Sequence, residues 1–198
     1  MQPAAVGSMG NKDNETLYRL NTKYEEASEL PSAVLLSVLG FGHVLSAIMW
    51  LGGGLLTAFV IGPSLRNMSP PASLEFNAKV LPKIVSFVRM AVVSTYAFGV
   101  LLLYFLYDGD TSWLMNTTQG YVISAGVLLA LVAGILGFGF TIPAFSKVSR
   151  LSAEALQNGK PPAPELMNYG KRARTGSMAV VFLLLIVLAM MVISGFAF

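Results

Sequence analysis

Three long stretches of the chain contain no charged residue. No Asp, Glu, Lys or Arg occurs in residues 30–65, 111–146 or 175–198. Hydrophobic residues make up 55% of the 198 residues and charged residues only 12%, which is about half the charged share of an average soluble domain. A helix that is apolar on every side must be surrounded by other protein or by lipid. A chain of 198 residues is too short to surround several such helices with protein. The stretches therefore exclude an ordinary soluble fold and predict a membrane protein.

The apolar residues divide into four segments long enough to cross a bilayer. A helix that spans the ~30 Å hydrocarbon core needs about 20 mostly apolar residues. The segments that meet this requirement are approximately 33–61, 84–107, 121–142 and 178–198. They are too continuously apolar for the strands of a membrane barrel. We therefore predict an all-α polytopic fold, with a four-transmembrane-helix bundle over 32–198 and an N-terminal tail over 1–31.

Basic residues lie beside one end of these segments. The connections on that side carry Arg66, Lys79, Lys83, Lys147, Arg150, Lys160, Lys171, Arg172 and Arg174. Because Lys and Arg collect in cytoplasmic loops, this pattern places 62–83 and 143–177 in the cytoplasm of a multi-pass plasma membrane protein. Both termini then lie on the non-cytoplasmic side. We expect the basic loops to contact anionic lipid of the bilayer and not nucleic acid.

Two regions outside the spans have their own patterns. Residues 14–30 place apolar side chains at helical spacing, which leaves an amphipathic surface helix and a disordered tail as alternatives, and we expect Pro31 to end any such helix.

After the third span, Pro143 stands at the membrane exit, and 144–157 continues with helical spacing. The proline-rich residues 160–164 then form an extended tether within the cytoplasmic region 143–174.

Only two ionisable residues lie well inside the spans, and such residues are costly there. His43 is in the first span and Arg89 in the second. Each belongs to a helical face of polar and small residues, and together the two faces form a candidate intramembrane polar face. Its members are His43, Ser46, Trp50 and Thr57 on the first span, and Arg89, Tyr96 and Tyr104 on the second. Consecutive spans run in opposite directions, so we expect His43 in the outer half of the membrane, Arg89 in the inner half, and no direct pair between them.

The role of this face has two interpretations. Glycines at positions 42, 53 and 54 permit close helix approach, which favours a packing face with one hydrogen-bonded histidine. The three consecutive glycines 52–54 also predict a locally loosened helix. Alternatively, His43 binds a metal or haem, or relays protons. Arg89 is more consistent with a structural role that faces the bundle or inner phospholipid head groups than with catalysis.

The sequence contains no cysteine, one histidine and ten methionines. It therefore lacks thiolate sites and two-histidine sites within one chain. An imidazole with a thioether suits Cu(I) or a six-coordinate haem, so His43 with Met190 or Met191 is the candidate metal site. Methionine also fills gaps in packed helices, and that interpretation stays open. The cofactor is unknown, with copper and haem as the two candidates.

The polar face also carries a resemblance to a known family. The segment from His43 through Trp50 to Gly52-Gly53 resembles the first-helix signature of the CopD-like copper-resistance membrane proteins, in which Trp follows His by seven residues and Gly comes next. Phe87-Val-Arg89-Met-Ala91 is similar to the aromatic–x–Arg–x–Ala stretch of their next span. The resemblance covers about 33–198 and implies a membrane bundle whose His43 and Arg89 faces point inward, with a role in copper handling. Related HemJ-type protoporphyrinogen oxidases share an early histidine, but their essential intramembrane lysine has no counterpart in this sequence.

We therefore expect a non-catalytic integral membrane protein of the CopD-like type. It would act in copper handling or as an accessory subunit of a larger membrane complex, with other membrane subunits or a second copy of the chain as lateral partners. The alternative is a haem- or copper-binding membrane redox protein that uses His43 as a ligand. A transporter is a third option, although the spans carry no acidic residue to couple ions.

Overall fold

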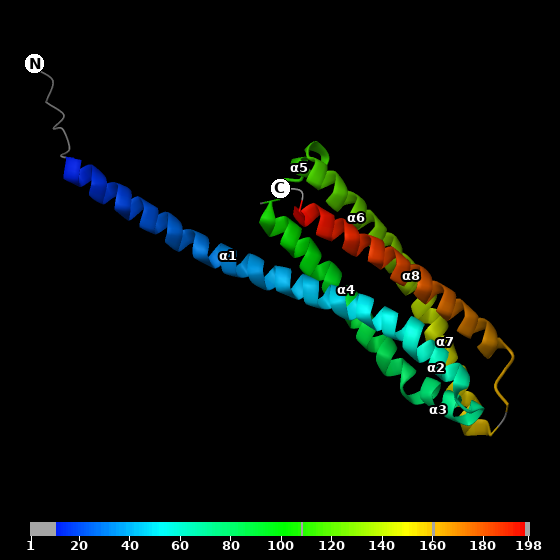
Figure 1. The fold of residues 1–198 in the computed structure, drawn as a ribbon. Coiled ribbons are helices and arrows are strands. Elements are labelled where there is room, and N and C mark those ends of the chain that lie inside the picture. The colour runs from blue at the N-terminus through cyan, green and yellow to red at the C-terminus, as the bar shows by residue number, and fades with distance from the viewer. Residues whose placement is uncertain (1–10, 108, 160, 197–198) are drawn as a thin grey trace, which may run out of the picture.

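The computed structural model describes residues 11–107, 109–159 and 161–196, and these ranges contain helices and connections but no strand. The predicted all-α class is confirmed (Figure 1). The elements in chain order are α1 (Asn11–Leu55), the π-helix η1 (Leu56–Ile61), α2 (Gly62–Asn67), α3 (Pro70–Lys79), α4 (Leu81–Leu106), α5 (Ser112–Asn116), α6 (Thr118–Leu136), the π-helix η2 (Gly137–Thr141), α7 (Ile142–Asn158) and α8 (Glu165–Phe196).

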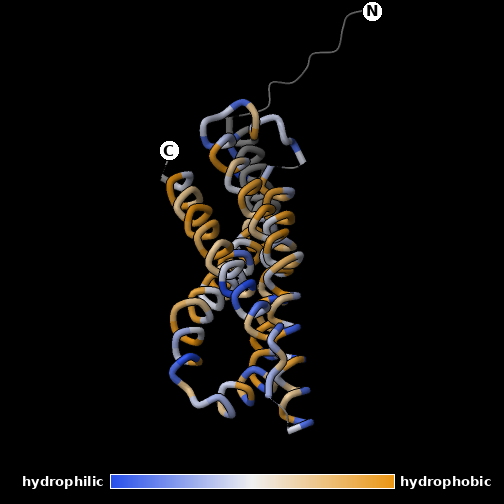
Figure 2. Tube along the Cα trace, turned by 90° about the vertical axis from the view of Figure 1, so that its right-hand side faces the viewer, coloured by the Kyte–Doolittle hydropathy of each residue, from blue (hydrophilic) through white to orange (hydrophobic). Residues whose placement is uncertain are grey.

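Four helical runs are long and apolar enough to cross a membrane. They are Ser32–Asn67, Leu81–Leu106, Thr118–Asn158 and Glu165–Gly195. Only 17–28% of the most apolar window of each run is buried inside the protein, so most of the apolar side chains point outward. Figure 2 shows hydrophobic colour along much of the length of the long helices, with hydrophilic colour in the connections at the ends of the bundle. Lipid stabilises such a surface, whereas water destabilises it.

The helix that begins in the N-terminal tail does not end at Pro31. Residues 11–30 are helical, which resolves the choice between helix and disorder, but α1 runs unbroken from Asn11 to Leu55 and joins the first span. The expectation that Pro31 ends the helix is therefore wrong. A proline inside a helix costs about 3 kcal/mol, yet strong helix formers precede it and the apolar span follows it directly. One proline between two favourable helical segments is insufficient to separate them.

The first and third apolar runs each contain a π-helical segment with a proline two residues after its end. In η1 the backbone N–H of Gly62 donates to the Thr57 carbonyl, and after η2 the N–H of Ile142 donates to the Gly137 carbonyl, both five residues back. Pro63 and Pro143 come next and have no N–H to donate. A π-turn takes up the disturbed register, so each helix passes through its proline. Glycines 52–54 lie in regular α-helix, so the loosening expected at them is not found there, and the π-turn begins at Leu56.

The third apolar run consequently continues through Pro143 as one helix. The run Thr118–Asn158 has 41 residues and a length of ~61 Å, more than the 40–45 Å of a whole bilayer. Its last part, α7, places six residues in the protein interior and its charged residues on the other side. As predicted, α7 ends at Asn158-Gly159, where Gly159 takes the left-handed conformation (φ 59°), and residues 161–164 are not helical.

All four spans meet in one apolar core. Its buried members are Trp50, Ala91, Val92, Ala133, Val180 and Leu184. Within the bundle α1 lies along α4, α6 lies along α8, and α3 packs against α7 (Figure 1). A second buried cluster, Leu81, Val85, Ile142 and Val148, joins α4 to α7 near α3. We call the side of the bundle that holds α2, α3 and α7 the basic end, because the basic connections lie there.

Candidate functional site

His43 lies in the contact between α1 and α4. Its Nδ1 is 3.0 Å from the backbone carbonyl oxygen of Thr95, to which it can donate. The ring packs against Gly99, where a Cβ atom would lie 2.9 Å from the imidazole Cε1. The missing side chain of Gly99 therefore provides the room for the imidazole. Among the residues that the structure describes, Nε2 has no hydrogen-bond partner.

The hydroxyl groups of the polar face on the first apolar run, Ser46 of α1 and Thr57 of η1, each bond to a carbonyl four residues back. Ser46 Oγ donates to the Gly42 carbonyl at 2.7 Å, and Thr57 Oγ1 donates to the Gly53 carbonyl at 2.7 Å. Ser46 is 5% exposed and Thr57 half-buried. A hydroxyl that bonds four residues back satisfies itself without a ligand or another helix. These two members of the predicted polar face therefore have a structural explanation.

Trp50 and Tyr96 connect α1, α4 and α6. The two rings lie 5.7 Å apart between centroids and are tilted by 57°. The Tyr96 hydroxyl donates to the Ala130 carbonyl of α6 at 2.5 Å, and the phenol fits there because Gly134 has no side chain. Ring contact and hydrogen bond together bind three helices at the centre of the bundle.

The three glycines predicted to permit helix approach lie in such contacts. A Cβ atom on Gly42 would lie 2.8 Å from the Phe98 ring, and one on Gly53 would lie 3.0 Å from Val88 Cγ2. A Cβ atom on Gly54 would lie 2.8 Å from Val181 Cγ2 of α8. Gly42 and Gly53 thus bring α1 onto α4, and Gly54 brings it onto α8.

Met190 and Met191 contact a different helix from His43. A Cβ atom on Gly126 of α6 would lie 3.3 Å from the Met191 methyl and 3.9 Å from Met190 Cβ. His43 is held by α4, and no described contact joins it to either methionine. In the described part of the chain, no three His, Cys, Asp or Glu side chains gather as a metal-binding group. A single imidazole is thus the ligand that the α1–α4 contact offers.

Arg89 and Tyr104 lie outside the contact that contains His43. Tyr104 is 59% exposed and packs edge-on against Phe105, with centroids 5.3 Å apart. Arg89 is exposed and lines a groove at the basic end. The face of α4 that meets His43 carries the small residues Thr95 and Gly99. These small residues indicate where α4 packs against α1 better than Arg89 and Tyr104 do.

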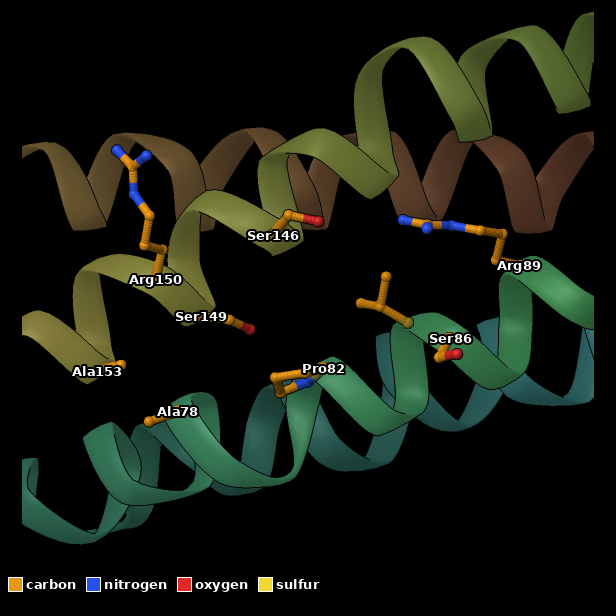
Figure 3. Close-up of a pocket in the computed structure, with 9 residues that line it drawn as sticks. Ala78, Pro82, Ser86, Arg89, Ser146, Ser149, Arg150 and Ala153 are labelled. Carbon is orange, nitrogen blue, oxygen red and sulfur yellow. The ribbon is translucent and has the colours of Figure 1, made fainter.

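The groove lies between α3, α4 and α7 and has a volume of about 430 Å³. Its nine lining residues are Ala78, Pro82, Val85, Ser86, Arg89, Ser146, Ser149, Arg150 and Ala153. Figure 3 shows Arg89 extending from α4 toward α7, and the Ser149 hydroxyl pointing into the space between α7 and α4. Two guanidinium groups and no carboxylate line this space.

Sequence reasoning used Arg150 only as one more basic residue of a loop, and it missed the serines. The available signal was their spacing, since Ser146, Ser149, Arg150 and Ala153 recur at three- and four-residue steps on α7. Their connection to Arg89 could not be found in this way, because the groove forms only when α7 packs on α3 and α4.

The far end of the bundle carries an ordered turn before α5. The Ser112 N–H donates to Asp110 Oδ1 at 2.8 Å, and the Ser112 hydroxyl donates to Oδ2 at 3.0 Å. These two bonds, the backbone one first, lower the pKa of the Asp110 carboxyl from its ordinary value. Asp110 therefore holds the turn that leads into the short helix α5.

Comparison with known proteins found no family model that matches this chain, no similar curated protein and no similar solved structure. The properties of the site therefore rest on its own geometry.

Proposed function

We propose that this chain is a non-catalytic integral membrane protein of the CopD-like type that handles copper. It would lie in the plasma membrane with both termini on the non-cytoplasmic side and with residues 62–83 and 143–177 in the cytoplasm. The excess of Lys and Arg in those two regions supports this orientation. The bonds of Ser46, Thr57 and Tyr96 to backbone carbonyls support a structural role for the rest of the polar face.

The observation that carries the copper proposal is the hydrogen bond between His43 Nδ1 and the Thr95 carbonyl. A carbonyl oxygen can only accept a hydrogen bond, so Nδ1 must be the protonated ring nitrogen that donates to it. In the neutral imidazole the Nε2 lone pair is then available for a ligand. Histidines that bind metals commonly have their other ring nitrogen bonded in this way, which sets both tautomer and ring orientation. Imidazole is a suitable copper ligand. In this proposal copper is the ion that the protein binds and passes on, and it is not a resident cofactor.

The test is copper binding by the purified full chain in mild detergent. We expect about one Cu(I) per chain by mass spectrometry and by competition with a chromophoric chelator. His43→Ala should abolish this binding while helical circular dichroism is retained. Exposed Tyr104→Phe is the matched control and should bind as the parent chain does. Copper that is absent, or unchanged in the histidine variant, would refute the proposal.

Two further measurements decide between the remaining candidates. The double variant Met190→Leu with Met191→Leu assigns the thioethers as ligands if it weakens Cu(I) binding. A reduced-minus-oxidised visible spectrum tests the redox alternative, because a bound haem gives a Soret band that His43→Ala would remove.

The second candidate function is an accessory subunit of a larger membrane complex. It is supported by the first half of the α1 span, where Phe41 is 70% exposed, Val34 63% and Ile48 62%, while Leu39 is the one buried residue in 32–45. A helix so little covered by its own chain can pack against a lateral partner. Recovery of the same membrane subunits with the tagged protein, and their loss from Phe41→Ser, would support this function. Recovery of the chain alone would argue against it.

A further inference from the structure

We propose that the groove between α4 and α7 is a binding site for a phosphate group, presented either by an anionic phospholipid headgroup or as free phosphate. This inference does not depend on His43 or on copper. The groove lies at the basic end and uses none of the residues of the α1–α4 contact.

The charges of the groove favour an anion. Arg89 and Arg150 line it, and no Asp or Glu does. Arg150 Nε is 3.2 Å from Glu154 Oε1, an exposed pair that contributes little. Arg89 has neither an ion pair nor a hydrogen bond within the described residues, although it is eight residues into an apolar span, ~12 Å along α4 from Leu81. An unpaired guanidinium at that depth is stabilised by an anion that satisfies its fork of N–H donors.

A buried hydroxyl in the same groove also has no partner. Ser149 is 8% exposed, and its buried Oγ has no hydrogen-bond partner among the residues that the structure describes. It points into the groove from α7 (Figure 3). Other serines of this helical bundle bond to a carbonyl of their own helix, as Ser46 does to Gly42 and as Ser146 does to Ile142 in the same groove at 3.0 Å. A buried hydroxyl left unpaired is costly, and a phosphate oxygen would accept its proton.

Size and position fit a phosphate carried by a lipid. The groove volume of about 430 Å³ is within the range of small-ligand sites. Beside the polar groups, Val85, Pro82 and Ala78 form an apolar wall. The helix run Thr118–Asn158 is too long to stay in the bilayer, so α7 emerges near this level, where head groups lie. Basic pockets between membrane helices bind anionic head groups in this way.

The experiment uses the full chain in lipid nanodiscs and in detergent. In nanodiscs of phosphatidylcholine with increasing phosphatidylglycerol, retained lipid is counted by native mass spectrometry. In detergent without anionic lipid, inorganic phosphate is titrated and followed by thermal unfolding. Retention of phosphatidylglycerol identifies a headgroup site, and saturable stabilisation by inorganic phosphate identifies a free-phosphate site.

Substitutions test whether the groove is responsible. Arg89→Gln should weaken binding roughly tenfold to a hundredfold, since hydrogen bonds to charged groups are the strong ones. The matched control is Arg66→Gln, which removes the same charge from the exposed end of α2 and should leave the affinity within about twofold. Equal losses from both variants, or no binding that depends on Arg89, would overturn the proposal.

The two unpaired serines provide a second control. Ser149→Ala should weaken phosphate binding several-fold and yet raise the melting temperature of the ligand-free protein, because it removes an unsatisfied buried hydroxyl. Ser152 is equally unpaired and 0% exposed but does not line the groove. Ser152→Ala should therefore raise the melting temperature and leave binding unchanged. If Ser149→Ala behaves in the same way as Ser152→Ala, the hydroxyl does not contact the ligand.

Discussion

The two ionisable residues inside the spans, His43 and Arg89, have opposite surroundings. His43 lies where α1 and α4 approach closely, and the Thr95 carbonyl and the bare Gly99 backbone hold its ring. Arg89 lies at the basic end, where it lines the groove between α3, α4 and α7. A polar side chain in a tight helix contact uses the backbone as its partner. One in an open groove has a free hydrogen-bonding group that can receive a ligand.

The largest expected effect breaks the tight contact. Gly99→Ala places a Cβ atom 2.9 Å from the His43 ring, which must shift, and overpacking of this kind costs about 1–3 kcal/mol. The control is Gly40→Ala on α1, where a Cβ atom meets nothing within 4 Å and a better helix former should be neutral or stabilising. Thermal unfolding in detergent measures both. Equal stabilities of the two variants would show that α1 and α4 do not pack as described.

The next effect concerns the centre of the bundle. Tyr96→Phe removes the hydrogen bond to the Ala130 carbonyl but keeps the ring against Trp50, so we expect a loss of about 0.5–1.5 kcal/mol. Tyr104→Phe removes an equivalent hydroxyl from an exposed ring and should have no effect on stability. Chemical or thermal unfolding of the pair isolates the bond between α4 and α6. A larger loss for Tyr104→Phe would contradict the placement of these two tyrosines.

A smaller effect is expected from a hydroxyl that bonds only to its own helix. Thr57→Val keeps the shape of the side chain and removes the bond to the Gly53 carbonyl. That carbonyl belongs to a helix, and the hydroxyl reaches no other element, so the change in stability should be within about 0.5 kcal/mol. A loss as large as that of Tyr96→Phe would indicate that Thr57 has a further partner.

The smallest effect is a local one at the far end of the bundle. Asp110 has a lowered pKa because the Ser112 N–H and hydroxyl donate to its carboxylate. Such a group stabilises the folded turn at pH values above the ordinary carboxyl pKa, and this contribution is lost as the pH falls through the lowered value. The protection of the Ser112 amide against hydrogen exchange, corrected for the intrinsic exchange rate at each pH, should therefore fall in acid. Asp110→Asn should remove that acid dependence and leave the exchange of α4 and α6 amides unchanged.

Much of the fold could be predicted because membrane insertion depends on local composition. The four apolar runs, the helix over 144–157, its end at Gly159 and the tether after it follow from residues close together in the sequence. The error at Pro31 came from treating a proline as a helix end, whereas strong helix formers on one side and an apolar span on the other keep α1 continuous. The same reasoning explains why Pro63 and Pro143 produce π-turns and not breaks.

The partners of the polar side chains could not be predicted in this way. The partner of His43 is the backbone carbonyl of Thr95, and a backbone acceptor leaves no signal in the sequence. Arg89 was grouped with Tyr96 and Tyr104 by helical spacing, although only Tyr96 points into the bundle. Spacing defines a face of a helix, and it does not say which neighbour covers that face.

The sequence by itself therefore determined that four helices are long and apolar enough to span a membrane, which ends of them are basic, and that just two ionisable side chains lie deep within them. These properties depend on the free energy of transferring each segment from water to lipid. That free energy is set by the residues of the segment itself and does not depend on the other helices. The tertiary structure decided that His43 meets a carbonyl and that Arg89 meets a groove with an unpaired Ser149. Those environments form between helices distant in the chain, where glycines let two backbones approach closely and where α7 packs against α3 and α4.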